Sequence, residues 1–465
     1  MKHFFILFTL LAFLDSNAQT YPSSNINLLS VIKPGGPTGY SGCWGWYQAS
    51  KNKEYALAQG QNGYLYFIDV TIPTSPIVCD SVKGKPFINR EVKTYQNYCY
   101  SVAGSTGSGT VHSFQIIDMS NLPGTVTVVY SGNTYFTSAH TIWIDKSNLY
   151  CAAVGHGTVY SSMEVYSLAT PTAPILLRKV EQDHPINGGV HDMYVRNDTV
   201  FASSMNQGLF VYTFNGSNFN LIGTLANYTE AGYNHSSYLT ADGKTLVFCD
   251  EIPSGVSIKT ADVTNLNNII VKALFKPNNQ SDFVAHNPYI LGNKWALVSC
   301  YQDGLNVYNI SNPSSPSLEG YFDTYPQGGF NTGNYNGDPY QGNWGAYPYF
   351  PSGNILALDM TNGAFMLQLS PTIGLKEQTK NNLSVRIQQN PASQFISYQI
   401  ESNESGTYKL ELNDALGKCV LKIKDELNST SCCNTVDINE IPNGIYFFTI
   451  SLKDKTYKEK IIITH

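Results

Sequence analysis

The sequence predicts an all-β chain with two domains, a seven-bladed β-propeller followed by a small C-terminal β-sandwich. A unit of four strand-like runs separated by turn signals stands out over 284–326. Parts of this unit recur along the chain at intervals of about 50 residues, a period typical of propeller blades. After residue 370 the repeats stop, and a polar stretch leads into a different series of alternating strands.

The unit over 284–326 has the pattern of an antiparallel meander. Runs of β-branched and aromatic residues are separated by Gly-Asn at 292–293, by Gln-Asp-Gly at 302–304 and by SNPSSP at 311–316. Gly, Asn and Asp tolerate the positive φ of tight turns, and Pro cannot donate to a β-ladder. Because four such strands have two faces to bury, the unit is predicted to pack against copies of itself.

The first strand of the unit recurs seven times, and the copies align on one anchor position. An aromatic residue stands three positions after the anchor in every copy except the second, which has Lys93. The anchors are Trp44, Arg90, His140, His191, His235, His286 and Trp344. Seven blades follow from this count, and a merged or divided repeat would change the number to six or eight.

Domain boundaries follow from the extent of the repeats. We expect the propeller over 19–372, a polar linker over 373–383 and the sandwich over 384–465. The last repeat has three strands, and the run INLLSVI at 26–32 is predicted to supply its missing outer strand. This pairing would close the ring and remove the open edges that a sheet must otherwise protect.

Residues 1–18 have the pattern of a secretory signal peptide. A basic start is followed by an apolar run from Phe4 to Leu14 and by small residues before Gln19, as in cleaved leaders. The alternative is a buried N-terminal strand or helix. The run is too short to span a bilayer, and no later stretch is apolar for long enough, so we expect a secreted or cell-surface protein without a transmembrane segment.

The composition argues against a nucleic-acid partner and against a disulfide scaffold. Charged residues make up 13% of the 465 residues, the net charge is −6, and 32 Tyr outnumber 28 Lys and Arg. Nucleic-acid binding requires a basic footprint, which this chain lacks. The nine Cys include no CxxC pair, and those at 99, 151, 249 and 300 are predicted to be small core residues in the second strands of their blades.

Four consecutive anchors are histidines: His140, His191, His235 and His286. Each anchor opens an innermost strand, so we expect their imidazoles to surround one mouth of the central channel. Neutral imidazole binds Zn, Cu, Ni and Fe, and a divalent metal at the channel mouth is therefore one hypothesis. A second is that each histidine hydrogen-bonds to the neighbouring blade and braces the ring, and a third is contact with a substrate.

The second strand of each blade runs back to the same face. Residues at those strand ends, or directly after an anchor, are candidates to orient the histidines or to contact a ligand, and they are Asp192, His156, Asp250, Glu251, Asp303 and Asp359. The long loop 328–343, rich in Gly and Asn, is predicted to cover the channel mouth or to bind a ligand there.

Several phrases of the first domain resemble the choice-of-anchor B family, which is built of LVIVD-type propeller repeats. They are GCWGWYQ at 42–48, the turn D-[VM]-[TS]-x-x-P, AHNPYILGNKW at 285–295 and WGAYPYFPSGNILALD at 344–359. The resemblance covers roughly 26–372 and implies the fold more than an activity. This chain departs from the family where Arg90-Glu91 replaces a His-Asp pair, which argues against a complete ring of functional histidines.

The last domain resembles the type A C-terminal sorting domain of type IX secretion. The matching residues are NP at 390–391, DALGK at 414–418, VDINEIPNGIY at 436–446 and the terminal KIII at 460–463. The resemblance implies export across the outer membrane through the type IX secretion machinery, often with removal of the domain and attachment to surface polysaccharide. The alternative for this sandwich is a carbohydrate-binding module.

Together these patterns predict a non-catalytic binding or interaction module, with a surface polysaccharide or a protein as its ligand. The alternative is a metal-dependent hydrolase or lyase that uses the His-rich face. The sequence assigns no catalytic residue and no organic cofactor. It also leaves open whether the exported protein is anchored to the outer cell surface or released.

Overall fold

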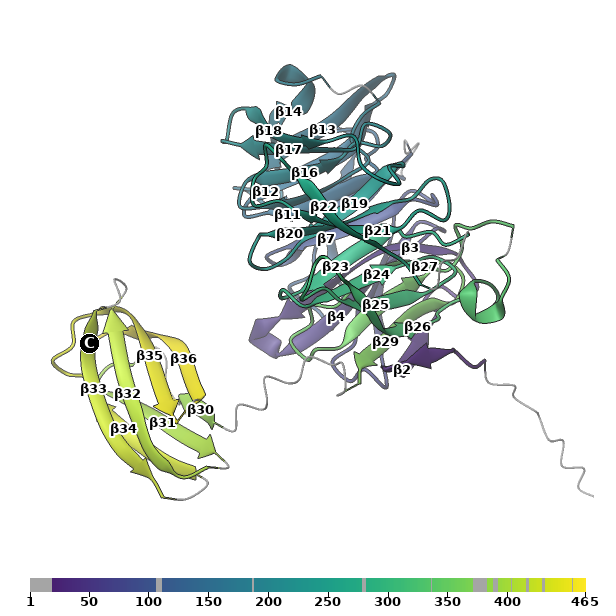
Figure 1. Cartoon of the computed structure of the whole chain (residues 1–465). Helices are drawn as coiled ribbons and strands as arrows, with labels where there is room; N and C mark the ends of the chain where they lie inside the picture. The colour runs from purple at the N-terminus through teal and green to yellow at the C-terminus, as the bar shows by residue number, and fades with distance from the viewer. Residues whose placement is uncertain are drawn as a thin grey trace, which may run out of the picture. The chain divides into compact units, whose positions relative to one another are not determined.

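The computed structural model describes residues 19–105, 111–185, 188–277, 282–335, 337–370, 383–387, 392–402, 404–414, 418–428, 431–453 and 455–465 (Figure 1). Two compact units divide the chain, Met1–Ser370 and Pro371–His465. The predicted signal peptide and residues 373–382 of the predicted linker lie outside the described residues, whereas Leu383 begins the first strand of the second unit.

Seven antiparallel sheets of four strands or more make up the first unit. Blade 1 contains β3 (Tyr40–Gln48), β4 (Lys53–Gly60), β5 (Tyr64–Asp69) and β6 (Ile77–Lys83). Blade 2 contains β7 (Arg90–Tyr95), β8 (Tyr98–Ala103), β9 (Phe114–Asp118) and β10 (Thr127–Gly132). Blade 3 contains β11 (Thr141–Asp145), β12 (Asn148–His156), β13 (Val159–Ser167) and β14 (Ile175–Lys179). Blade 4 contains β15 (Asp192–Arg196), β16 (Thr199–Ser203), β17 (Leu209–Phe214) and β18 (Phe219–Leu225). Blade 5 contains β19 (Asn234–Leu239), β20 (Thr245–Asp250), β21 (Ile258–Asp262) and β22 (Ile270–Phe275).

Blade 6 contains β23 (Asn287–Leu291), β24 (Trp295–Ser299), β25 (Leu305–Asn309) and β26 (Ser317–Phe322). Blade 7 contains β27 (Asn343–Tyr347), β28 (Ile355–Asp359), β29 (Gly363–Leu369) and β2 (Ile26–Ile32). The first strands of successive blades contact one another in the cycle β3, β7, β11, β15, β19, β23, β27 and back to β3. This closed cycle is the wall of the central channel, and the predicted seven-bladed propeller is confirmed.

The N-terminal segment closes the ring as predicted. β2 pairs antiparallel with β29, with Ile26 opposite Leu369, and the short β1 (Ser23–Ser24) adds to the outer edge of blade 6. The ring of Tyr21 lies against Phe322 of blade 6 and Phe365 of blade 7. One short stretch of chain therefore holds two blades together.

Apolar side chains are buried mainly between neighbouring blades. One cluster joins Ala152 and Val165 of blade 3 to Met193 and Val200 of blade 4, and comparable clusters join other neighbouring blades. Each fully buried aliphatic side chain contributes about 1.5–3 kcal/mol, so the blade interfaces stabilise the ring. The cysteines at 99, 151, 249 and 300 are buried, and all nine cysteines are free thiols.

The second unit is a sandwich of two sheets. β30 (Leu383–Ile387), β31 (Phe395–Ser402) and β34 (Ser431–Asp437) form one sheet, and β33 (Cys419–Leu427), β32 (Gly406–Asp414), β35 (Gly444–Leu452) and β36 (Lys455–Ile463) form the other. Buried side chains of both sheets share one core.

Helical structure is limited to three short 3₁₀ turns in the described residues, η1 (Ala49–Lys51), η2 (Val180–Gln182) and η3 (Phe330–Thr332). In the part of the chain that the structure describes, no helix has the length and hydrophobicity to cross a membrane.

Candidate functional site at the channel mouth

The four anchor histidines form a continuous arc around the channel. The ring centroids lie 4.4 Å apart for His140 and His191, 4.3 Å apart for His191 and His235, and 4.3 Å apart for His235 and His286. Trp344 of blade 7 continues the arc, 4.8 Å from His286. Each residue stands at or next to the start of an innermost strand, which is why residues distant in sequence meet here.

A pocket of about 340 Å³ opens above this arc. Its walls include the four histidines, Trp344, and the residues that follow the second strands of blades 5, 6 and 7, namely Glu251, Tyr301 and Met360. Asp338 and Tyr340 of the loop 328–343 also line it, and the Tyr340 ring meets the Tyr301 ring edge-on at 5.5 Å. The structure thus places part of this loop at the channel mouth.

Main-chain carbonyls of the next blade hold two of the histidine rings. Nδ1 of His191 donates to the carbonyl of His235 at 3.4 Å, and Nδ1 of His286 donates to the carbonyl of Trp344. A neutral imidazole that donates from Nδ1 carries its free lone pair on Nε2. The same contact therefore braces two blades and leaves one ring nitrogen able to accept a proton or bind a metal.

Burial keeps the arc uncharged at neutral pH. It lowers the pKa of His140 to about 4 and that of His286 to about 3. The pKa values of His191 and His235 are also well below the usual range, first because the rings are buried and second because the neighbouring imidazoles would repel a positive charge.

Glu251 and Asp338 are the acidic residues that line the mouth pocket, and Glu251 lies beside the histidines. It is 9% exposed, Oε1 accepts a hydrogen bond from the Tyr301 hydroxyl at 2.7 Å, and Oε2 lies 3.9 Å from Nε2 of His235. Burial raises its pKa to about 6, and the Tyr301 hydrogen bond opposes that rise. Among the described residues, His235, Glu251 and His286 form a group whose ligand atoms all lie within 4.8 Å of one another.

A second layer of polar groups lies beneath the arc. A cavity of about 20 Å³ is lined by Arg90, Glu91, Thr141 and Asp192 together with the four histidines. Burial raises the pKa of Asp192 to about 6, while the nearby Lys93 ammonium lowers it and Glu91 raises it. Asp192 therefore faces this inner cavity rather than the open pocket.

A ring of aromatic side chains and one lysine lies deeper in the channel. Its members are Trp44, Lys93, Trp143, Tyr194, Tyr238, Tyr289 and Tyr347, one from each blade, and most are joined by ring contacts. Nζ of Lys93 lies 4.3 Å from the Trp44 ring centroid and 2.9 Å from Oε1 of Glu91. Lys93 stands where the other blades have an aromatic residue, and its ammonium group completes the ring by lying against the face of Trp44.

The predicted anchor of blade 1 is wrong. Trp44 lies in the deeper ring, 5.0 Å from Tyr347 and 5.9 Å from Trp143, and it does not line the mouth pocket. The pairing of β3 with β4 is irregular between Tyr40 and Cys43, as the pairing of the first two strands is around His235 in blade 5 and around Trp344 in blade 7, which makes Ser41 the equivalent of those anchors in blade 1. Trp44 occupies the place that lies three residues after the anchor in the other blades.

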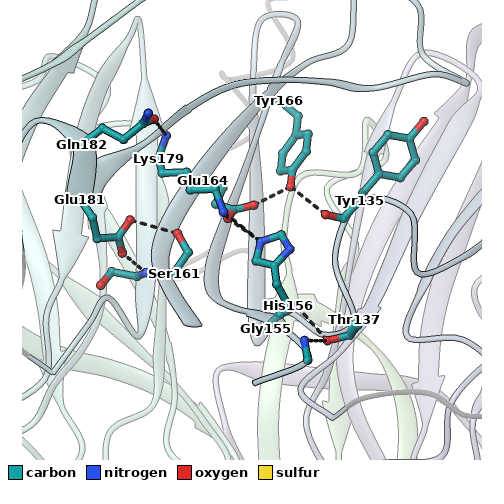
Figure 2. A network of polar contacts seen from close by, with 12 residues as sticks. Tyr135, Thr137, Gly155, His156, Ser161, Glu164, Tyr166, Lys179, Glu181 and Gln182 are labelled. Atoms are coloured by element: carbon teal, nitrogen blue, oxygen red, sulfur yellow. Dashed lines mark hydrogen bonds and ion pairs between the residues drawn. The ribbon is translucent and has the colours of Figure 1, made fainter. Parts of the chain in front are cut away.

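Besides Asp192, four of the predicted candidates lie outside the mouth pocket and have other partners. His156 contacts Glu164 through Nε2 at 2.7 Å, and Lys179 reaches the same carboxylate at 2.7 Å. Figure 2 shows this network, in which the Tyr166 hydroxyl also contacts Glu164. It ties the ends of β12 and β14 to Glu164, which lies within β13 of the same blade.

The three aspartates at the strand ends are likewise engaged in local structure. Asp250 pairs with Lys259 at 2.7 Å, and both side chains are fully buried. Asp303 accepts from the amide of Phe330 at 2.8 Å, and Asp359 accepts from the Thr324 hydroxyl at 2.6 Å. Of the strand-end candidates, only Glu251 reaches the mouth.

Sequence reasoning missed Tyr301, which orients Glu251 and packs against His286 with 4.5 Å between ring centroids. Glu251 directly follows the second strand of blade 5, which ends at Asp250, whereas Tyr301 stands two residues after the second strand of blade 6, which ends at Ser299. Counted from the anchors His286 and His235, Tyr301 aligns in the repeat with Asp250 and not with Glu251, so the repeat alone does not indicate that Tyr301 and Glu251 meet.

Comparison with known proteins identifies the second unit. A profile of the secretion system C-terminal sorting domain matches residues 389–464. This domain directs the chain to the type IX secretion machinery, and hence to the cell surface or the medium. No curated protein matches the chain.

Solved structures resemble the propeller at low sequence identity. YCF48 from Cyanidioschyzon merolae is 7% identical, with a TM-score of 0.50, and covers 75% of this chain and 100% of its own. The β-propeller domain of Cps50 (Swd1) from Myceliophteria thermophila is 11% identical with a TM-score of 0.48, covering 74% and 99%. The computationally designed Ika8 protein is 11% identical with a TM-score of 0.49, covering 74% and 99%. The likeness to YCF48 shows the fold alone.

Proposed function

We propose that this protein is a non-catalytic binding module of the cell surface, exported by type IX secretion, which takes its ligand into the mouth pocket of the propeller. The pocket carries the proposal. Its volume of about 340 Å³ falls within the range of small-ligand sites, and it combines aromatic walls with a few converging polar groups, as such sites do.

The ligand class that suits these walls is a sugar unit of a surface polysaccharide. Tyr301, Tyr340 and Trp344 offer aromatic faces or edges, onto which the apolar face of a sugar ring packs. The neutral imidazoles and Glu251 offer hydrogen-bond acceptors and donors for hydroxyl groups. The deeper ring of aromatic side chains lies beyond the histidines, so we expect the ligand to enter from the mouth side.

The hydrogen bonds made by the neighbouring acidic groups favour binding of a ligand over its chemical conversion. Asp250, Asp303 and Asp359 are engaged in hydrogen bonds within the protein, so they do not serve as a pair of acid and base in the pocket. The resemblance of the propeller to the choice-of-anchor B family is part of this proposal. That family is defined by its architecture more than by an activity.

The test is a screen of the purified full chain against an array of soluble and immobilised glycans, followed by affinity measurement on the best ligand. Replacing Tyr340 by Ala removes one wall of the pocket from a loop position, and we expect binding to weaken about tenfold or more. Tyr47→Ala is the matched control, because Tyr47 is 37% exposed and hydrogen-bonds to Asn52 away from the pocket.

Two outcomes would contradict the proposal. One is that no glycan binds the full chain, and the other is that Tyr340→Ala and Tyr47→Ala behave alike.

The second candidate function is a metal-dependent hydrolase or lyase, and the grouping of His235, Glu251 and His286 favours it. The two candidates differ in the fate of the ligand. A binding module returns the glycan unchanged after long incubation, whereas an enzyme yields products of altered mass, which mass spectrometry of the supernatant detects.

A further inference from the structure

We infer that a divalent transition-metal ion binds in the mouth pocket, held by one imidazole nitrogen each from His235 and His286 and by the carboxylate of Glu251. This inference rests on the proposed function in that the ion would lie in the same pocket and contact the same ligand.

The spacing of the three ligand atoms is close to that of a coordination sphere. They lie within 4.8 Å of one another, and Oε2 of Glu251 is 3.9 Å from Nε2 of His235. Bonds of about 2.1 Å to a tetrahedral ion place the ligands about 3.4 Å apart. Small rotations of the side chains close that difference, without movement of the strands.

Each of two ligands is already oriented by a hydrogen bond from its other atom. Nδ1 of His286 donates to the Trp344 carbonyl, which leaves Nε2 for the ion. Oε1 of Glu251 accepts from the Tyr301 hydroxyl at 2.7 Å, which leaves Oε2 for the ion. Partners of this kind accompany most metal-binding histidines and carboxylates, because they fix the tautomer and the direction of the lone pair.

The charges in the pocket also suit a cation. Both histidines are buried, and Nδ1 of His286 donates to the Trp344 carbonyl, so its Nε2 carries a lone pair that can bind a metal. Glu251 is buried, and among the described residues the one basic side chain at ion-pair distance is His235, whose imidazole is neutral, so an ion would compensate the charge of Glu251. Two nitrogens and one carboxylate favour Zn²⁺, Fe²⁺ or similar ions over Ca²⁺ and Mg²⁺, which prefer oxygen.

Three protein ligands leave coordination positions open toward the pocket. An oxygen of the bound ligand, such as a sugar hydroxyl or carboxylate, would occupy them. The metal would then act as part of the binding surface and fix the orientation of the ligand.

The experiment is a titration of the chelator-treated full chain with Co²⁺, followed by visible absorption, together with metal analysis of the protein equilibrated with Zn²⁺. We expect one ion per chain and absorption bands of Co²⁺ bound by nitrogen and oxygen. Glu251→Gln keeps the shape of the side chain and should weaken binding at least tenfold, and Tyr301→Phe should weaken it about tenfold by freeing the carboxylate.

His156→Gln is the matched control, because this histidine also contacts a glutamate at 2.7 Å but lies outside the pocket. Its metal content should equal that of the parent chain. Substoichiometric binding by the parent chain, or equal affinity in the parent and Glu251→Gln, would overturn the inference.

Glycan affinity measured with and without chelator separates this inference from the proposed function. If the glycan binds, depends on Tyr340 and is insensitive to chelator, the metal site fails and the binding function stands. If one ion binds through Glu251 and no glycan binds, the metal site stands and the binding function fails.

Discussion

The hydroxyl of Ser236 donates a hydrogen bond to the main-chain carbonyl of His286 in the next blade. Thr141 makes the equivalent contact with the carbonyl of His191 at 3.2 Å. The residue directly after a histidine anchor thus links its blade to the following one, in the layer just beneath the imidazoles. The bracing predicted for the histidines is shared with these two hydroxyls.

Replacing Ser236 by Ala should lower the free energy of unfolding by about 1 kcal/mol, because Ser236 is 2% exposed and water does not replace the lost donor. Urea denaturation followed by tryptophan fluorescence measures the change. Ser237→Ala is the control, since this neighbour is 7% exposed and its hydroxyl has no hydrogen-bond partner among the described residues. Equal losses in the two variants would show that the contact between blades contributes nothing.

Glu251 should make the metal-free protein less stable as the pH rises. Its pKa is about 6 in the folded protein and 4.5 ordinarily, so the folded state binds the proton more tightly than the unfolded state. The resulting stabilisation is complete below pH 4.5 and is lost as the pH rises through 6, by about 2 kcal/mol in total.

The measurement for Glu251 is the difference in unfolding free energy between the parent chain and Glu251→Gln, taken from pH 4.5 to 7.5 in the presence of a chelator. The other titrating groups are the same in both proteins, so their contributions to the difference in unfolding free energy cancel. The advantage of the parent chain over the variant should shrink with rising pH. A difference that stays constant, or grows with pH, would contradict the assignment.

The buried pair of Asp250 and Lys259 should be structural. Asp250→Asn leaves the Lys259 ammonium uncompensated where both side chains are fully buried, and we expect a loss of about 3–5 kcal/mol. Replacing Lys259 by Met in the same chain should recover part of that loss. Chemical denaturation measures stability, and glycan affinity of the folded fraction should stay unchanged, because neither residue lines the mouth pocket. A selective loss of affinity would restore Asp250 as a functional residue.

Removal of the second unit should abolish export without harming the propeller. The last propeller strand ends at Leu369, and the amide of Ser370 bonds to the carbonyl of Asn25 at 2.9 Å, so a chain ending at residue 370 keeps every strand of the ring. We expect this chain to accumulate in the periplasm while the full chain reaches the surface or the medium. Cell fractionation with immunoblotting measures the distribution, and thermal unfolding checks that the truncated propeller is intact. Export of the folded truncated chain would contradict a sorting role for residues 389–464.

Blade number and closure were predictable because they depend on local patterns. Turn signals such as 292–293 and 302–304 recur in each blade, and the alternating run 26–32 has one unpaired partner in the incomplete last repeat. The register of blade 1 was not predictable in the same way. The segment GCWGWY has aromatic residues at both Trp44 and Tyr47, three positions apart, so this pair can be aligned as anchor and aromatic partner although Trp44 itself holds the partner's place.

Convergence of the four histidines followed from their common place in consecutive blades. The partners of the acidic residues did not, because these partners come from connecting loops whose paths the repeat does not determine. Tyr335 contacts Asp303, Thr324 contacts Asp359 and Tyr228 contacts Asp250. From sequence position alone, all the acidic residues at the strand ends were expected on one face. The contacts just named hold the three aspartates in local structure, whereas Glu251 lines the mouth pocket.

The pairing of β2 with β29 has a kinetic consequence. β2 is the first long strand of the propeller to be synthesised and β29 is the last, whereas blades 1 to 5 each draw their strands from one continuous stretch. Contacts between distant parts of a chain form late, since loop-closure entropy opposes them. The ring should therefore remain an open arc until its final strand has emerged, and β2 must stay unpaired through the folding of its neighbours.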